Sequence, residues 1–249
     1  MNRRAFFVVA GVVALTSGGI LAGGNIGSVF AARLSAGESA TTLSTTHAAG
    51  AARKSGAAKQ PVATESVDGV NDIDPHKAFG SRSAPIVMEV FSDYQCPACR
   101  QYFETTNRQL MDNYVSNGKV FLIHRDFPLP MHAYSRIAAR YARAAAEIGK
   151  VEPVEQALFD NQEKWEQTGD VDGTVAAGLT PAEMSKVRAL VKGGTLEPLI
   201  SKDYELGEMY RISQTPTTVF HYKGQTYPYA GVMSYENLSQ FLNQLLSQK

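Results

Sequence analysis

The clearest apolar pattern in the chain lies at 86–91 (IVMEVF), a short and almost uninterrupted hydrophobic run. Runs of this length that are rich in β-branched residues are typical of strands buried on both faces. A helix is predicted to begin at Pro97, because proline suits the first helical position, and to continue towards Tyr114. After an Asn-Gly turn, a second apolar run at 120–123 predicts another strand. This order of elements predicts a right-handed parallel crossover.

The rest of the chain divides into a helical middle and a mixed end. Apolar periodicity predicts four helices in the middle, at 133–148, 154–165, 180–191 and 196–210. The third opens with a capping box. Residues 217–222 and 226–230 flank a Lys-Gly turn and predict a β-hairpin, which a last helix at 235–246 follows. The chain is therefore predicted to be an α/β protein, βαβ then ββα, with a helical insertion at about 131–210.

The first 31 residues have the pattern of an export signal. Arg3 and Arg4 precede an apolar stretch that meets no further charge until Arg33, which is the arrangement of a signal peptide. Cleavage is predicted after Ala31. The stretch at 5–24 is also about long enough to span a bilayer, so a membrane anchor is the alternative. The arginine pair fits either a twin-arginine signal or an ordinary one.

Residues 32–75 are predicted to form a flexible linker. Ala, Ser, Thr and Gly fill 21 of the 30 positions in 31–60, where no aromatic residue occurs. A segment of this composition buries too little apolar surface to offset its ordering entropy. Residues 76–249 are then predicted to form a single domain.

Charge and cysteine content narrow the class of protein. The chain has 24 Lys+Arg and 24 Asp+Glu, so it lacks the basic surplus with which proteins neutralise a phosphate backbone, and a nucleic-acid partner is not expected. Its two cysteines are too few for a disulfide framework or a four-thiolate zinc site. Both cysteines lie in one four-residue stretch, CPAC at 96–99.

The position of Cys96 at the start of the predicted helix has a chemical consequence. Unpaired N–H groups and the positive end of the helix dipole favour a thiolate there, which lowers the pKa of Cys96. A stabilised thiolate is a good leaving group, so a disulfide between Cys96 and Cys99 is predicted to be oxidising. Cys99 lies one turn further along and is expected to be more buried and to act as the resolving thiol.

Two other uses of the cysteine pair are open. A disulfide that closes a four-residue loop would stabilise the fold by only about 2 kcal/mol in the loop-entropy relation, so a structural staple is disfavoured. A zinc site would need two of the five histidines, and none of these has the paired spacing of zinc ligands. The redox interpretation is therefore preferred, and no metal is expected.

The segment 89–99 (EVFSDYQCPAC) resembles the active-site segment of the DsbA family of thioredoxin-fold disulfide oxidoreductases. The resemblance extends to 125–129 (RDFPL) with His132, and to 214–217 (QTPT), which is similar to the loop that bears the family's cis-proline. It covers most of the chain from about His76. It implies a thioredoxin fold with an inserted helical block, an enzyme that needs no cofactor, and substrates that are cysteine-containing client proteins.

The resemblance also implies roles for individual residues. Cys96 corresponds to the nucleophile that forms a mixed disulfide with the client and Cys99 to the resolving thiol, with Pro97 and Ala98 between them as supporting residues. Pro216 is implied to be cis, with the alternative of an ordinary trans turn proline. The backbone of Thr215 is implied to pair with an extended client segment, much as an added β-strand does.

Glu89 matches the acidic residue that family members bury behind the active site. There a desolvated carboxyl group with a raised pKa relays protons. The alternative is a glutamate on an edge strand that faces water. Neither His124 nor His132 is expected to act as a base, and His132 is expected to cap or pack near the second helix.

Two departures from the family pattern leave the direction of electron flow open. The dipeptide Pro97-Ala98 lacks the histidine found in strongly oxidising members, and Thr215 resembles the residue in isomerase and reductase relatives. We expect an exported enzyme of the periplasm or another extracytoplasmic compartment that forms disulfides in clients, with a quinone-linked membrane protein as its reoxidant. The alternatives are an isomerase or reductase kept reduced by a membrane electron donor, and a non-catalytic, chaperone-like peptide-binding module.

Overall fold

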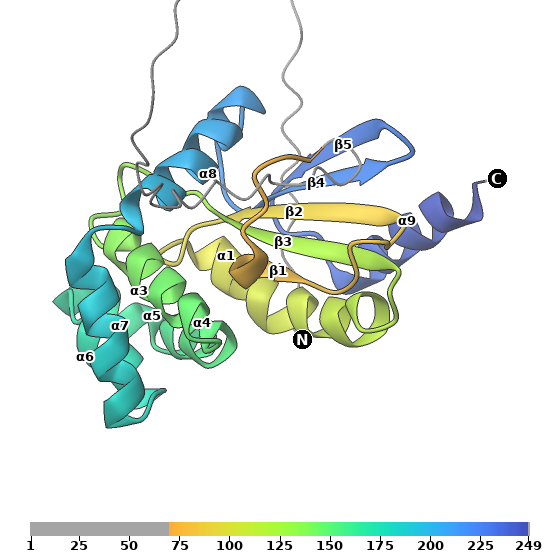
Figure 1. Cartoon of the computed structure of the whole chain (residues 1–249). Coiled ribbons are helices and arrows are strands. Elements are labelled where there is room, and N and C mark those ends of the chain that lie inside the picture. Colours follow the sequence, from red (N-terminus) through yellow and green to blue (C-terminus); the bar gives the residue numbers. More distant parts are fainter. Residues whose placement is uncertain (1–69, 249) are drawn as a thin grey trace, which may run out of the picture. The chain divides into compact units, whose positions relative to one another are not determined.

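The computed structural model describes residues 70–248, which are built around a five-stranded mixed sheet (Figure 1). Its strands are β1 (Ala78–Phe79), β2 (Ile86–Ser92), β3 (Val120–Asp126), β4 (Thr217–Tyr222) and β5 (Gln225–Ala230), in the order β1-β3-β2-β4-β5. Strands β2 and β3 are parallel, and the other neighbouring strands are antiparallel. The predicted parallel pair and the terminal hairpin are both present. The short edge strand β1 carries too little pattern to be predicted.

The helix after β2 is continuous from Pro97 to Val115 and has several labels along its length. It begins as α1 (Pro97–Tyr102) and runs without a break through α2 (Arg108–Leu110) and two π-helical segments to Val115. The other helices are α3 (Ser135–Glu147), α4 (Val151–Asp160), α5 (Gln162–Thr168), α6 (Val171–Ala177), α7 (Pro181–Gly193), α8 (Glu197–Met209) and α9 (Tyr235–Ser247). The predicted capping box of α7 is present at Thr180 and Glu183.

The helical middle differs from the prediction in two places. The helix expected at 154–165 is interrupted at Asn161, where α4 ends and α5 begins. The indole N–H of Trp165 donates to the carbonyl oxygen of Leu158 at 2.6 Å, and this side-chain contact takes up a carbonyl near the break. Helix α6 was not predicted, because its seven residues bury only Val171 and Val175, too few to set an apolar period.

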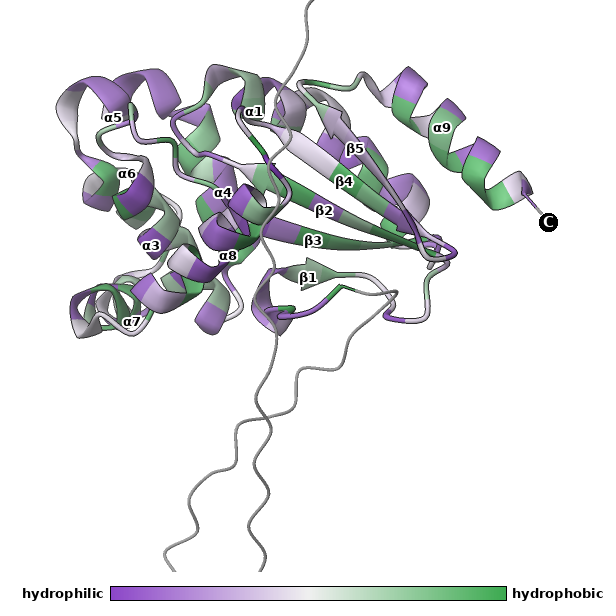
Figure 2. Cartoon of the chain, turned by 90° about the horizontal axis from the view of Figure 1, so that it is seen from above, coloured by the Kyte–Doolittle hydropathy of each residue, from purple (hydrophilic) through white to green (hydrophobic). Residues whose placement is uncertain are grey.

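The two faces of the sheet are covered by different segments. Helix α1 with its continuation and helix α9 pack on one face, where Met88 and Val90 of β2 point. Helix α8 packs near Phe91 on the opposite face, and residues 70–77 cover Val87 there (Figure 1). Figure 2 shows apolar residues concentrated along the central strands and alternating with polar ones along α9. Alternate residues of β2 therefore reach two separate cores.

The packed domain begins before His76, the boundary expected from composition. Val70 and Ile73 are 1% and 3% exposed and pack against the sheet, so these two apolar side chains anchor the end of the expected linker. The predicted signal or anchor at 1–31 and the linker up to residue 69 lie outside the described residues. Among residues 70–248, no helix is both long and apolar enough to cross a membrane.

Candidate active site

Cys96 lies at the junction of the β2–α1 loop with α1. It occupies the position just before the first helical residue, and its carbonyl oxygen accepts the backbone N–H groups of Cys99 and Arg100, both at 3.1 Å. Pro97 follows as the first helical residue and is exposed, while Ala98 is half-buried. Both cysteines are free thiols. The loop thus places the Cys96 sulfur at the N-terminal end of the helix.

The environment of Cys96 favours its thiolate. The Cys99 thiol donates a hydrogen bond to Cys96, and this contact has the largest influence on its pKa. Burial opposes the effect, whereas the Thr215 hydroxyl and the backbone N–H groups of Ala98 and Cys99 add to it. Together they lower the pKa of Cys96 to about 6. The direction agrees with the prediction from the helix terminus, although the neighbouring thiol contributes more than the backbone does.

Cys99 has the opposite character. Its side chain is 0% exposed, and burial, followed by the nearby Cys96, raises the pKa of Cys99 well above its ordinary value. The backbone N–H of Asp93 donates to Cys99 Sγ at 3.4 Å, but this contact does not offset the burial. The two thiols therefore differ in acidity although only two residues separate them.

The loop before β4 lies against the cysteine pair. The Thr215–Pro216 peptide bond is cis, as the resemblance implied. Cys96 Sγ lies 3.4 Å from the Thr215 carbonyl oxygen and, as a thiol, donates to it. Thr215 Oγ1 is buried and has no hydrogen-bond partner in the described part of the chain, so its hydroxyl is free to donate to a thiolate at Cys96. The structure thus brings Thr215 and Pro216 together with Cys96.

Asp93 supports the loop from beneath and was not singled out from the sequence. Its carboxylate, 1% exposed, accepts from the N–H of Leu129 at 2.7 Å and the hydroxyl of Ser135 at 2.5 Å. It also lies 2.8 Å from Nδ1 of His132, which packs near the start of α3 as expected. The one sequence feature that could have identified Asp93 is its position within the segment 89–99 that contains the cysteines. Asp93 therefore connects the cysteine loop to the segment after β3.

The structure corrects the prediction for Glu89. Glu89 is buried on the central strand β2 and is 0% exposed, so it does not face water. Its pKa is lowered rather than raised: burial acts to raise it, but hydrogen bonds and charge from His221 and Arg125 outweigh burial. It also points to the α8 face, whereas Cys99 shares a cavity with Val90 and Ser92 on the α1 face. The raised pKa expected of a proton relay is therefore absent at Glu89.

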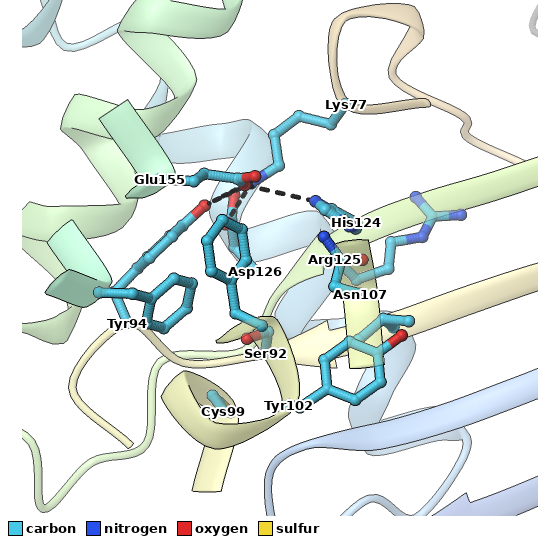
Figure 3. Close-up of a pocket in the computed structure, with 13 residues that line it drawn as sticks. Lys77, Ser92, Tyr94, Cys99, Tyr102, Asn107, His124, Arg125, Asp126 and Glu155 are labelled. Carbon is cyan, nitrogen blue, oxygen red and sulfur yellow. Dashed lines mark hydrogen bonds and ion pairs between the residues drawn. The ribbon is translucent and has the colours of Figure 1, made fainter. Parts of the chain in front are cut away.

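A second buried charged cluster, which the sequence did not reveal, lies on the α1 face beside Cys99 (Figure 3). Glu155 Oε1 accepts from the Tyr94 hydroxyl at 2.7 Å and lies 3.3 Å from His124 Nδ1 and 3.6 Å from Lys77 Nζ. Lys77 also donates to Asp126 at 2.9 Å. The residues come from four separate segments, so no local motif marks them. We call Lys77, Tyr94, His124, Asp126 and Glu155 the α1-face cluster.

The alternative use of the cysteine pair was a metal site, which needs several ligand side chains close together. Within residues 70–248, no group of three or more His, Cys, Asp or Glu side chains is arranged to hold a metal ion.

A comparison with protein families gives one match. The family model described as thioredoxin aligns with residues 73–244, more than half of the chain. The chain belongs to the thioredoxin family. This match covers β2, the cysteine pair, the helical insertion and the hairpin with Pro216.

Curated relatives match parts of this thioredoxin-family chain. Disulfide bond formation protein D of Bacillus subtilis is 25% identical over 162 residues, 61% of this chain and 71% of the relative. The Na(+)/H(+) antiporter NhaA 3 of Salinispora tropica is 27% identical over 154 residues, again 61% of this chain. That alignment covers 22% of the antiporter, so the chain spans about a fifth of that relative's length.

Solved structures share the fold at low sequence identity. Alpha-DsbA1 of Wolbachia pipientis has a TM-score of 0.57 at 17% identity, covering 68% of this chain and 89% of that one. A thioredoxin-like oxidoreductase of Silicibacter pomeroyi has a TM-score of 0.58 at 22% identity, covering 71% and 95%. BdbD of Bacillus subtilis has a TM-score of 0.51 at 19% identity, covering 69% and 93%. The predicted DsbA-like thioredoxin fold is confirmed.

Proposed function

We propose that the chain is a thiol:disulfide oxidoreductase that acts on cysteine-containing client proteins through Cys96 and Cys99. The observation that carries the proposal is the contrast between the two thiols, since the pKa of Cys96 is lowered to about 6 and that of Cys99 is raised. A thiolate beside a protonated, buried partner is the arrangement that thiol–disulfide exchange requires. The name of the Bacillus subtilis relative, disulfide bond formation protein D, agrees with this activity.

The proposed cycle begins with Cys96 and Cys99 joined in a disulfide. A client thiolate attacks Cys96 Sγ, the mixed disulfide forms, and Cys99 leaves as a thiolate that takes up a proton. A second client thiolate then attacks the client sulfur of the mixed disulfide and displaces Cys96. The products are a client disulfide and the reduced enzyme, so two electrons pass from the client to the cysteine pair.

The cis-proline loop is the proposed client site. Thr215 lies beside the Cys96 sulfur, so a client segment that pairs with its backbone holds a client cysteine close to the reacting atom. The Thr215 hydroxyl contributes to the stabilisation of the Cys96 thiolate. Pro97 and Ala98 complete the proposed active-site segment, with Pro97 exposed next to the nucleophile.

The oxidising direction is favoured by the low pKa of Cys96. Stabilisation of the thiolate stabilises the reduced enzyme, and this makes the disulfide form a better oxidant. The second candidate is an isomerase or reductase kept reduced by a membrane donor. It is favoured by the Pro97-Ala98 dipeptide, which places no cationic side chain between the cysteines to stabilise the thiolate further.

The remaining proposals concern the setting of the enzyme. We propose that residues 1–31 direct export or anchor the chain, that the DsbA-like domain expected at 76–249 begins earlier, at Val70, and that the enzyme works in the periplasm or another extracytoplasmic compartment. Its proposed redox partner is a membrane protein linked to quinones. A thioredoxin-fold chain of this kind carries its redox chemistry on cysteine sulfur and needs no cofactor.

The deciding experiment is equilibration of the purified chain with a glutathione buffer, followed by a client-oxidation assay. An oxidase gives a cysteine pair that is reduced over most of the buffer range and oxidises a reduced client. A reduction potential near that of thioredoxin assigns the reductase or isomerase role. Replacement of Cys96 by Ser removes either redox activity. If Cys96→Ser leaves client folding unchanged, the chain is a chaperone-like peptide-binding module instead.

A further inference from the structure

The peptide bond that ends β2 lies against the sulfur of Cys99. Its carbonyl oxygen, on Ser92, accepts the backbone N–H of Phe127 at 2.8 Å. Its N–H, on Asp93, lies just past the end of the strand and donates to Cys99 Sγ at 3.4 Å. A hydrogen bond to the carbonyl end of a peptide polarises its N–H and makes that donor stronger. The sheet therefore fixes a peptide unit whose N–H points at the buried sulfur.

Ser92 supplies a second donor to the same sulfur. Ser92 and Cys99 line one small cavity of about 20 Å³ (Figure 3). The Ser92 hydroxyl hydrogen-bonds to Cys99 and, like the Asp93 N–H, acts to lower the pKa of this thiol. We call these two groups, the Asp93 N–H and the Ser92 hydroxyl, the Cys99 donor pair. They belong to adjacent residues, so the end of one strand places both of them.

The buried carboxylate of Asp93 holds this end of the strand in place. Its Oδ1 accepts the N–H of Gln95 at 2.7 Å and the hydroxyl of Ser135 at 2.5 Å. Its Oδ2 accepts the N–H of Leu129 at 2.7 Å and lies 2.8 Å from His132 Nδ1. A carboxylate has about four acceptor sites, so these neighbours use all of them. The peptide that carries the Asp93 N–H is thereby fastened on its side-chain end as well as to the sheet.

Charge is present on Cys99 only while disulfides are exchanged. When a client thiolate opens the Cys96–Cys99 disulfide, the S–S bond breaks and Cys99 leaves as a thiolate, which then takes up a proton. In the reverse step Cys99–SH loses its proton, attacks Cys96 in a mixed disulfide and expels the other sulfur as a thiolate. Before and after each step Cys99 is neutral, either as a disulfide sulfur or as the thiol that burial favours. Donors that act on the charged sulfur alone therefore change rates and leave the equilibrium in place.

Fixed donors are effective at a sulfur that water does not reach. Cys99 is 0% exposed, so bulk solvent does not stabilise its thiolate. In a site without water, donors that are already in place stabilise developing charge strongly, because they need no reorganisation when the charge appears. Backbone N–H groups have this role in oxyanion holes, where the charged atom is an oxygen.

We propose that the Cys99 donor pair stabilises the transient thiolate of Cys99, and that the Asp93 carboxylate is the positioning residue that aims the peptide at the sulfur. The proposal rests on the proposed redox function and assigns the groups that speed the step made by Cys99. The negative charge of Asp93 by itself disfavours a second negative charge nearby. Asp93 therefore acts through the position of its peptide, and this sets the sign of the test below.

The first test follows the reaction of the reduced full-length chain with DTNB, an aromatic disulfide whose released thiolate absorbs at visible wavelengths. The first release reports the attack by Cys96, and the second reports the attack by Cys99 on the mixed disulfide. Threonine and valine have nearly the same shape, but only threonine has a hydroxyl. We expect Ser92→Val to slow the second release at least about tenfold relative to Ser92→Thr. Both variants keep the wild-type first release.

The second test uses Asp93→Asn, which keeps the shape of the side chain and removes its charge. If Asp93 acted through its charge, this variant would give a faster second release. We expect a release at least about tenfold slower, because an amide has only one acceptor oxygen for the surrounding donors and so frees the peptide. Asp203→Asn is the matched control and keeps the wild-type second release. It also removes a buried carboxylate, but one that pairs with Arg125 and Arg143.

The equilibrium separates a rate effect from structural damage. The glutathione equilibrium of both Ser92 variants stays at the wild-type value. In Ser92→Val the attack of reduced glutathione on the disulfide form slows by the same factor as the second release. Equal second releases in Ser92→Val and Ser92→Thr, or a second release in Asp93→Asn that equals or exceeds that of the wild type, overturn the proposal. If Asp93→Asn does not fold, the two Ser92 variants decide. A wild-type chain that shows no second release at all contradicts the proposed function itself.

Discussion

The two faces of the central sheet carry buried clusters of matching composition and different surroundings. Each contains a glutamate, a basic side chain, a histidine and a tyrosine, and in each the glutamate accepts a tyrosine hydroxyl. The cluster on the α8 face consists of Glu89, Arg125, His221 and Tyr210. The corresponding members of the α1-face cluster are Glu155, Lys77, His124 and Tyr94.

The clusters differ in what lies beside them. Glu155, His124, Lys77 and Tyr94 line the cavity beside Cys99. Of the α8-face cluster Arg125 lines it too, whereas Glu89, His221 and Tyr210 do not. Both glutamates have lowered pKa values for the same physical reason, because cations and hydrogen-bond donors outweigh their burial. Chemical composition therefore does not distinguish the two clusters. Position relative to Cys99 does.

The largest effect is expected on the α8 face, from Arg125→Met. This change leaves Glu89 and Asp203 buried without the guanidinium that contacts both of them. It also removes the donor to the carbonyl oxygens of Asn71 and Asp72. Removing one partner of a buried ion pair costs about 3–5 kcal/mol, so we expect a loss of this size in the free energy of unfolding measured with urea.

The exposed pair of Arg188 and Asp172 provides the control for that measurement. Its two side chains are 53% and 40% exposed, and exposed pairs contribute about 1 kcal/mol or less. Arg188→Met is therefore expected to change stability little. A loss below about 1 kcal/mol in Arg125→Met would show that the α8-face cluster does not stabilise the fold.

The next largest effect is a pH dependence of the free energy of unfolding, which arises from Glu155 on the α1 face. Glu155 has a pKa of about 2 in the folded chain against an ordinary value of 4.5. A lowered folded pKa contributes stability that is present above pH 4.5 and is lost as the pH falls towards 2. Between pH 7 and pH 3 this loss amounts to about 2 kcal/mol.

The variant Glu155→Gln lacks this titration. We expect its stability at pH 7 to be lower than that of the wild type, and its further loss on acidification to pH 3 to be smaller by about 2 kcal/mol. Urea unfolding at the two pH values measures both quantities. Equal acid losses in the two proteins would mean that Glu155 has an ordinary pKa in the folded state.

The sequence predicted the elements that have a local pattern. The run at 86–91, the proline at position 97 and the capping box before α7 each determine structure from a few neighbouring residues, and each appeared where expected. The cysteine loop and the cis-proline loop carry equally local motifs. Their meeting at Cys96 and Thr215 followed from the family resemblance, because a contact between residues 119 apart leaves no periodic signal.

The α1-face cluster illustrates what the sequence could not predict. Lys77 lies where composition predicted only the start of a domain, and Glu155 lies in an ordinary amphipathic helix. From the sequence, both residues are expected to be charged side chains in contact with solvent. In the fold Lys77 is 1% exposed and Glu155 is 4% exposed. The prediction for Glu89 failed for a different reason: its burial was predicted correctly, but its charged neighbours were not. Arg125 and His221 come from the strands on either side of it and reverse the direction of its pKa.

A third effect tests whether the acidity of Cys96 depends on its immediate neighbours rather than on either cluster. The Cys99 thiol is the largest contributor to the low pKa of Cys96, and the Thr215 hydroxyl is a smaller one. We expect Cys99→Ala to raise the pKa of Cys96 by about one unit, equal to about 1.4 kcal/mol. Thr215→Val is expected to raise it by less. Thiolate absorbance in the ultraviolet, followed from pH 4 to 10, measures the midpoint.

The order of these two variants is the informative outcome. If Thr215→Val raises the midpoint more than Cys99→Ala does, the cis-proline loop rather than the cysteine pair stabilises the thiolate. If neither variant moves the midpoint from about 6, the backbone N–H groups at the start of α1 are sufficient.

The smallest effect on the two thiols is expected from Glu89→Gln, and its small size sharpens the contrast between the two faces. The amide keeps the shape of the side chain and one of its two acceptor oxygens. It removes the negative charge that faces Arg125 and His221. Because Glu89 points away from the face where Cys99 lies, we expect the Cys96 midpoint and the rate of Cys99 attack to stay at their wild-type values. Stability falls, since Arg125 loses a buried counter-charge. Ion pairs join Arg125 through Asp203 and Arg143 to Asp126 of the α1-face cluster. A change in either cysteine measurement would show that the charge of Glu89 reaches the thiols along such a connection.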